Sequence, residues 1–316
     1  MSSPFPLLRL PRLVLCEVFK SLSIGEKIKL SLCSKKVSAQ FNNARFYSQR
    51  VMVYLDMLNQ NIKVRSETDK DKFEISIHPH FGMSNDPDMQ QYRIEGRTVP
   101  GTSCRIRITT FWEKPREGSL SVLRHILKIF ECKISTNRDY DSDLYQSTIS
   151  LLFDLQMEFK TLTIHLKGSK GDNLLWNQIS NKLGLVEDLT ISSSLDPGFR
   201  PVFTSWPQKI NIMCIMCNWF TLETLLDCTC TTIILDKSHL GNKDLDVILK
   251  NWMTGGLPNL EYLKIQSQNI SKNGTTILGM NLRELAGMVI RTDDGSKKAT
   301  IKTNVQSIEM SVTPFE

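Results

Sequence analysis

The chain has 316 residues, of which 41% are apolar, enough to bury the core of one large domain or two. Its formal net charge is only +6, and its lysines and arginines form no dense block, so we expect no nucleic-acid partner. No apolar stretch is long enough to cross a bilayer, and charged residues interrupt the apolar start of the chain, so we expect neither a membrane span nor a secretory signal.

The N-terminal segment predicts an amphipathic helix. Leu10-Pro11 opens it, and proline suits the first helical turn, where a backbone N–H has no partner within the helix. The apolar residues that follow recur at the spacing of one helical face: Val14, Leu15, Val18, Phe19 and Leu22. A second helical run covers 25–33, and the basic pair Lys35-Lys36 comes directly after it.

Residues 5–45 resemble an F-box, the adaptor-binding module of SCF-type ubiquitin ligases. The Leu-Pro step, the apolar stripe and the ending Leu30-Ser31-Leu32-Cys33-Ser34-Lys35-Lys36 match in order, with cysteine where the family usually has valine. The resemblance implies three helices that bind a Skp-type adaptor and, through it, a cullin. The residues that it assigns to adaptor binding are Leu10, Pro11, Val14, Val18, Leu22, Leu30, Leu32 and Cys33. The alternative is a helical cap that packs on the rest of its own chain.

Residues 46–100 form a connector with short strands and loops in this interpretation. Residues 47–58 are compatible with a helix that continues from the F-box. The segments 73–77 and 104–108 alternate between apolar and polar residues as strands do, and a short strand is expected near 92–94.

One pattern recurs from about residue 129 onward: an apolar residue, two variable residues, an apolar residue, one variable residue and another apolar residue. The copies are 129–134, 159–164, 186–191, a shortened one at 210–212, 230–235 and 260–265. Their central positions are 21 to 30 residues apart, close to the period of leucine-rich repeats. The sequence therefore predicts a degenerate leucine-rich-repeat-like α/β solenoid over 101–316.

Helical patterns fall between these strands, as a solenoid requires. Apolar residues at helical spacing indicate helices over 119–130 and 143–156. Three further helices are expected after residues that commonly cap helices: 173–183 after Asp172, 222–226 after Thr221 and 243–252 after Asn242. Late strands are expected at 300–303 and 307–312.

A second resemblance covers about 172–270. A helix ending at Gly255-Gly256, the turn Leu257-Pro258-Asn259-Leu260 and the strand after it resemble the type 2 F-box-associated domain, which is known chiefly from expanded nematode F-box families. Trp176-Asn177-Gln178 also fits that family. The expected organisation is thus an F-box at 1–45, a connector at 46–100 and an F-box-associated domain at 101–316.

Catalytic and metal-binding motifs are not expected. Cys214-x-x-Cys217 and Cys228-x-Cys230 fit apolar core positions better than a zinc site, and His78-Pro79-His80 has no acidic or cysteine partner at a recognisable spacing. The eight cysteines lie mostly in apolar runs, which favours a reducing compartment, the cytoplasm or the nucleus. We therefore expect no enzyme activity, no metal and no cofactor.

These patterns together predict a substrate receptor of an SCF-type cullin-RING ubiquitin ligase. Its F-box would bind the Skp-type adaptor, and its C-terminal domain would bind a target protein. The alternative is a protein-binding scaffold without a ligase role, whose N-terminal helices cap the repeat domain.

Overall fold

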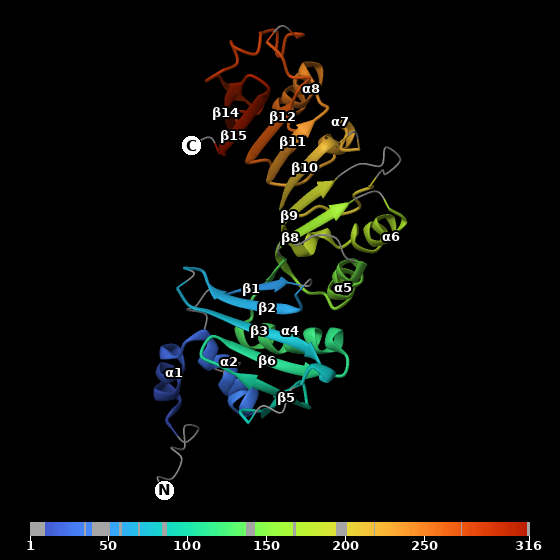
Figure 1. The fold of residues 1–316 in the computed structure, drawn as a ribbon. Helices are drawn as coiled ribbons and strands as arrows, with labels where there is room; N and C mark the ends of the chain where they lie inside the picture. Colours follow the sequence, from blue (N-terminus) through green and yellow to red (C-terminus); the bar gives the residue numbers. More distant parts are fainter. Residues whose placement is uncertain are drawn as a thin grey trace. The chain divides into compact units, whose positions relative to one another are not determined.

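The computed structural model describes residues 10–34, 36–39, 51–56, 59–68, 70–83, 87–136, 143–166, 169–193, 201–217, 219–272 and 274–314. The chain divides into two compact units, Met1–Asp139 and Tyr140–Glu316 (Figure 1). Residues 36–39 are helical, but most of the expected third F-box helix lies outside the described residues.

The first unit combines helices with a mixed sheet. Its elements are α1 (Arg12–Ser21), α2 (Ile24–Cys33), β1 (Val51–Asp56), β2 (Asn61–Ser66), β3 (Lys72–Pro79), the 3-10 helix η2 (His80–Gly82), β4 (Gln90–Ile94), β5 (Arg97–Ser103), β6 (Arg107–Trp112), α4 (Pro115–Phe130) and β7 (Ile134–Thr136). Its strands run in the order β7-β1-β2-β3-β6-β5-β4. The pairs β1–β7 and β3–β6 are parallel, and the other pairs are antiparallel.

The core of the first unit lies between this sheet and two helices. Both α2 and α4 contact β2, β3 and β4, and the two helices also contact each other. Phe73, Ile75 and Ile77 alternate along β3 and are all buried, as the period of two in a strand requires. The helix α2 is therefore a structural part of this unit as well as part of the N-terminal segment.

The second unit begins with parallel strands and ends with antiparallel ones. Its elements are α5 (Asp143–Asp154), β8 (Phe159–Leu166), α6 (Lys170–Ile179), the 3-10 helix η3 (Leu183–Leu185), β9 (Val186–Ser193), β10 (Lys209–Cys217), α7 (Leu222–Leu226), β11 (Thr232–Ser238), α8 (Asn242–Met253), β12 (Tyr262–Ser267), β13 (Val289–Arg291), β14 (Lys297–Asn304) and β15 (Ser307–Pro314). The strands β8 to β12 are parallel neighbours, and β15, β14 and β13 follow in antiparallel pairing.

Register aligns the apolar residues of the parallel strands in rows. One buried row crosses the strands β8 to β12 and continues into β15: Ile164, Ile191, Ile212, Leu235, Ile265 and Ile308. A second row, two residues earlier in each parallel strand, contains Leu162, Leu189, Ile210, Ile233 and Leu263. The recurring apolar pattern of the sequence thus marks the buried face of one sheet.

The predicted leucine-rich-repeat-like solenoid over 101–316 is wrong. Residues 107–136, which form β6, α4 and β7, belong to the first unit, and β7 pairs with β1 from the N-terminal side. At the other end of the chain, β12 pairs with the antiparallel strand β15. A solenoid would add one parallel strand per repeat. The observed fold is instead mixed α/β, with a largely β sheet of mixed strand direction.

Several local expectations are also corrected. Residues 51–56 form β1, where a helix was predicted over 47–58, because Val51, Val53 and Leu55 alternate toward the core. The strand predicted at 104–108 begins only at Arg107. The cap of α6 is Ser169, and Asp172 completes its capping box. Thr221 caps α7 as predicted, since its side chain accepts from the Thr224 N–H.

The end of α8 shows why glycine stands in the Gly-Gly turn. The helix stops at Met253, and Gly255 follows with a φ of +93°, in the left-handed region that glycine enters without strain. The chain then turns through Leu257-Pro258-Asn259-Leu260 into β12.

Candidate adaptor-binding surface

The helix α1 has two apolar sides, one buried and one exposed. It begins after Pro11, whose carbonyl accepts the Leu15 N–H at 2.9 Å. Leu15 and Phe19 are buried, whereas Leu13 is 82% exposed and Val14 is 47% exposed. The helix thus presents apolar surface to solvent as well as to the protein interior.

The buried side of α1 belongs to a small core cluster. Leu15 and Phe19 pack with Val37 and with Ile129 of α4. Four partly buried residues pack against this cluster: Leu10, Leu22, Leu30 and Phe130. Three of the residues predicted to bind the adaptor, Leu10, Leu22 and Leu30, therefore also contribute to packing within the chain.

The helix α2 begins with a complete capping box. The Ser23 hydroxyl accepts the Glu26 N–H at 3.3 Å, and the Ser23 N–H donates to the Glu26 carboxylate at 2.8 Å. The hydrogen bond from the Ser23 hydroxyl, with the one from its N–H, lowers the pKa of Glu26 below its usual value. This cap fixes the start of α2 at Ile24.

One face of α2 is buried within the first unit. Ile24, Ile28 and Leu32 recur every four residues along the helix and are all buried. Gly25 comes so close to β3 that an added Cβ would lie 2.5 Å from a ring carbon of Phe73. This close approach leaves no room for another protein between α2 and the sheet.

Polar contacts also fix α2 on the sheet unit. The Ile24 N–H donates to Asp71 Oδ2 at 2.7 Å, and the Lys29 ammonium donates to the Cys104 carbonyl at 2.6 Å. Further along the helix, Ser31 Oγ lies 3.0 Å from His125 Nε2 of α4. The N-terminal helices and the sheet of the first unit are therefore joined by hydrogen bonds as well as by apolar packing.

The eight residues predicted for adaptor binding fall into three groups. Pro11, Val14 and Cys33 are exposed. Leu10, Val18, Leu22 and Leu30 are half-buried, and Leu32 is only 3% exposed. The structure brings together on α1 the exposed residues Pro11 and Val14 with Leu13, which the sequence analysis did not select. The sequence does contain an indication of this exposed residue, because Leu13 is an apolar residue that lies outside the single apolar face of the helix.

Metal binding is a second chemistry that cysteine and histidine side chains can support, and it concerns the residues that the structure describes. Within them, no group of three His, Cys, Asp or Glu side chains is placed to hold a metal ion. Cys228 and Cys230 are buried, and a hydrogen bond with Cys228 together with burial raises the pKa of the Cys230 thiol. The side chains of Cys214 and Cys217 lie outside the described residues.

The two histidines of the segment His78-Pro79-His80 are both exposed to solvent. His78 lies at the end of β3, and His80 lies in η2.

None of the described helices combines the length and the apolar character that crossing a membrane requires.

Comparisons with known proteins agree with both resemblances. Residues 7–49 match the model of the F-box domain family, and residues 204–265 match that of the F-box associated family. An uncharacterized protein of Caenorhabditis elegans is 22% identical over 275 residues, which are 84% of this chain and 61% of that protein. The chain thus spans about three fifths of the length of this curated relative. No solved structure matches.

The two matched regions lie in the predicted order, one in each unit. Residues 7–49 include α1 and α2, and residues 204–265 run from β10 into β12. The chain therefore carries an F-box domain followed by an F-box associated domain.

Proposed function

We propose that this chain is a substrate-receptor subunit of an SCF-type cullin-RING ubiquitin ligase. Its F-box binds a Skp-type adaptor and, through it, a cullin, while its C-terminal domain binds a target protein. The observation that carries this proposal is the exposed apolar side of α1 inside the matched F-box, with Leu13 at 82% and Val14 at 47% exposure.

Burial of this surface would supply binding free energy. Covering a leucine or valine side chain completely stabilises a complex by about 1.5–3 kcal/mol. Leu13 and Val14 are neighbours on a helix whose opposite side is already fixed by Leu15 and Phe19, so little order has to be gained on binding.

The chain catalyses nothing itself in this proposal. Its contribution is to hold the target protein near the conjugating enzyme that the ligase recruits, which raises the effective concentration of the reacting groups. The site of action is the cytoplasm or the nucleus. The division into an F-box at 1–45, a connector at 46–100 and a target-binding region at 101–316 belongs to the same proposal.

The test uses charge on the exposed side of α1. The double variant Leu13→Glu/Val14→Glu places two carboxylates in the first turn of the helix, where the helix dipole favours negative charge, so the fold is retained. Adaptor affinity is expected to fall at least tenfold in co-purification and titration experiments, with an unchanged melting temperature.

Ile106→Glu is the matched control for this variant. Ile106 is 62% exposed in the first unit and lies outside the F-box. The control should bind the adaptor like the unmodified chain. Equal adaptor binding by the Leu13→Glu/Val14→Glu variant would remove this surface from the proposal.

One observation supports a second candidate, a protein-binding scaffold in which the N-terminal helices have a structural role. Ile24, Ile28 and Leu32 pack α2 on the sheet of the first unit. Deleting residues 1–45 would expose that core under either function, so deletion does not distinguish the two candidates. Complex formation by the intact chain does, because only the receptor requires the adaptor.

A further inference from the structure

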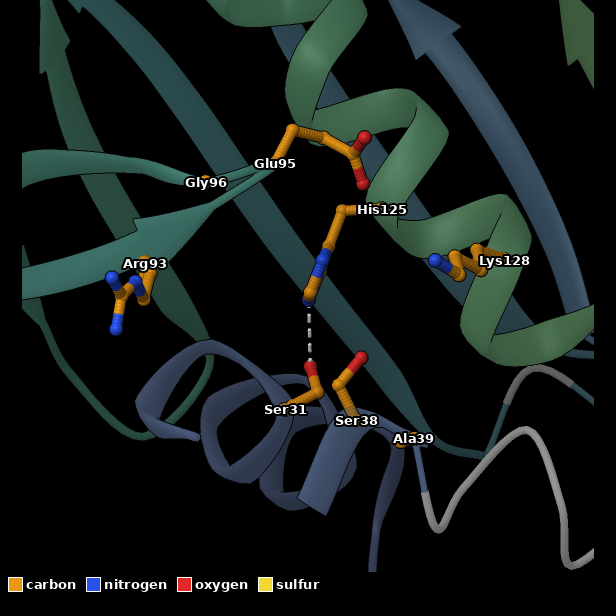
Figure 2. A pocket seen from close by; sticks show the side chains of 8 residues that line it. All are labelled: Ser31, Ser38, Ala39, Arg93, Glu95, Gly96, His125 and Lys128. Carbon is orange, nitrogen blue, oxygen red and sulfur yellow. Dashed lines mark hydrogen bonds between the residues drawn. The ribbon is translucent and has the colours of Figure 1, made fainter. Parts of the chain in front are cut away.

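A cavity of about 410 Å³ lies in the first unit where α2, α4 and the β4–β5 hairpin meet. Figure 2 shows the side chains that line it: Ser31, Ser38, Ala39, Arg93, Glu95, Gly96, His125 and Lys128. The lining is mostly polar, and it contains two cations and one carboxylate. A cavity of this size is in the range of small-molecule sites.

Two of the polar groups are already engaged with each other. The Ser31 hydroxyl donates to the Ile28 carbonyl at 2.6 Å, so the 3.0 Å contact with His125 is an N–H donated from His125 Nε2 to Ser31 Oγ. This hydrogen bond forms part of the cavity wall. The groups left to meet a ligand are the Ser38 hydroxyl, the two cations and the Glu95 carboxylate.

Some cations of the first unit form ion pairs with a carboxylate, and others do not. Arg97 and Lys114 form ion pairs with Glu117, and Arg107 pairs with Glu74. For Arg93 and Lys128, by contrast, the described part of the chain supplies no hydrogen-bond or ion-pair partner. In Figure 2 they stand on opposite sides of the Ser31–His125 hydrogen bond.

We propose that this cavity binds a small phosphate monoester that also carries an ammonium group. The phosphate, with a charge near −2 at neutral pH, matches Arg93 and Lys128, and the Ser38 hydroxyl donates to it. The ammonium group matches the Glu95 carboxylate, which would repel a bare anion. The ligand then has a net charge of about −1, opposite to the net charge of the three ionised side chains.

The test measures binding of O-phosphoethanolamine and of inorganic phosphate to the full chain by calorimetry. Arg93→Gln and Lys128→Gln should each weaken the binding of both probes about tenfold. Glu95→Gln should weaken the binding of O-phosphoethanolamine but strengthen that of inorganic phosphate, because it removes an attraction for one probe and a repulsion for the other.

Matched controls come from exposed cations elsewhere in the same unit. Arg105→Gln and Lys72→Gln remove the same charges outside the cavity and should leave both affinities unchanged. Equal binding by all variants, or no binding by the unmodified chain at millimolar probe, would overturn the proposal. The Arg93 and Lys128 variants should still co-purify with the adaptor, so this result is independent of the proposed ligase function.

Discussion

His125 is a buried imidazole that makes the first unit sensitive to acid. It is 6% exposed, and burial, with a smaller effect of Lys128, lowers its pKa from 6.5 to about 4. Between those two values the unfolded chain binds more protons than the folded one. The contribution of neutral His125 to the free energy of unfolding is therefore fully present above about pH 6.5, and it is lost as the pH falls toward 4.

The expected effect can be measured with urea unfolding at two pH values. At about pH 5 the free energy of unfolding should be lower by about 2 kcal/mol through this residue than at neutral pH. His125→Gln keeps a donor for Ser31 but cannot titrate, so its stability should change less between the two conditions. The same change in both proteins would show that His125 does not carry the acid sensitivity.

Asn242 was predicted to cap α8, but its side chain has a different structural role. The N-cap is Gly241, whose N–H donates to Asp244 Oδ2 at 2.8 Å. The Asn242 side chain instead donates to the carbonyls of Ser271 and Thr275, both at 2.9 Å, and accepts the Ser271 N–H at 3.0 Å. Its amide thus fixes a segment about thirty residues away.

Asn242→Ala should destabilise the second unit by about 1–3 kcal/mol, because the buried Asn242 amide makes three part-buried hydrogen bonds to the backbone that alanine cannot make. Asn259→Ala is the control: its side chain makes one exposed hydrogen bond, 3.2 Å to the Thr229 carbonyl, and its loss should cost under about 1 kcal/mol. Urea midpoints measure both. Equal effects would mean that the three contacts of Asn242 add nothing to stability.

At the scale of elements, the position of α2 depends on the absence of a side chain at residue 25. A Cβ there would lie 2.5 Å from the Phe73 ring. Gly25→Ala should therefore destabilise the first unit by about 1–3 kcal/mol, although alanine favours helices. Gly82→Ala, where nothing lies within 4 Å, should change the unfolding free energy by less than about 0.5 kcal/mol. An equally stable Gly25→Ala protein would show that α2 does not pack tightly on β3.

The strands of the second unit could be predicted because their signal is local. In 159–164, 186–191, 230–235 and 260–265 the apolar residues alternate, and each segment contributes to a strand with those residues buried. Alternation identifies a strand and its buried face. It does not identify the neighbouring strand or the direction of pairing.

The errors arise where pairing partners are distant in sequence. Nothing local in 51–56 shows that β1 lies between β2 and β7, and nothing in 260–265 shows that β12 has the antiparallel neighbour β15. The prediction of adaptor-binding residues has the same difficulty. The helical spacing finds the apolar residues of α1 and α2, but only the tertiary packing shows which of them are buried. The sheet beneath α2 buries Leu32, whereas α1 packs through Leu15 and Phe19 and leaves Leu13 exposed.

At the scale of the whole molecule, α1, α2 and the sheet of the first unit form one folded body. The helix α2 covers β2, β3 and β4 beside α4, so most of its apolar surface is used within the chain. Within the described part of the N-terminal segment, the surface proposed for the adaptor is the outer side of α1 together with the exposed end of α2 at Cys33. Variants confined to that surface separate binding from folding, whereas truncations do not.

The adaptor-binding role is tested most directly by co-expressing the intact chain with a Skp-type adaptor and determining the mass of the purified complex by size exclusion with light scattering. A one-to-one complex is expected, and the Leu13→Glu/Val14→Glu variant should elute without the adaptor. A folded, unmodified chain that elutes alone would contradict the role of a ligase receptor.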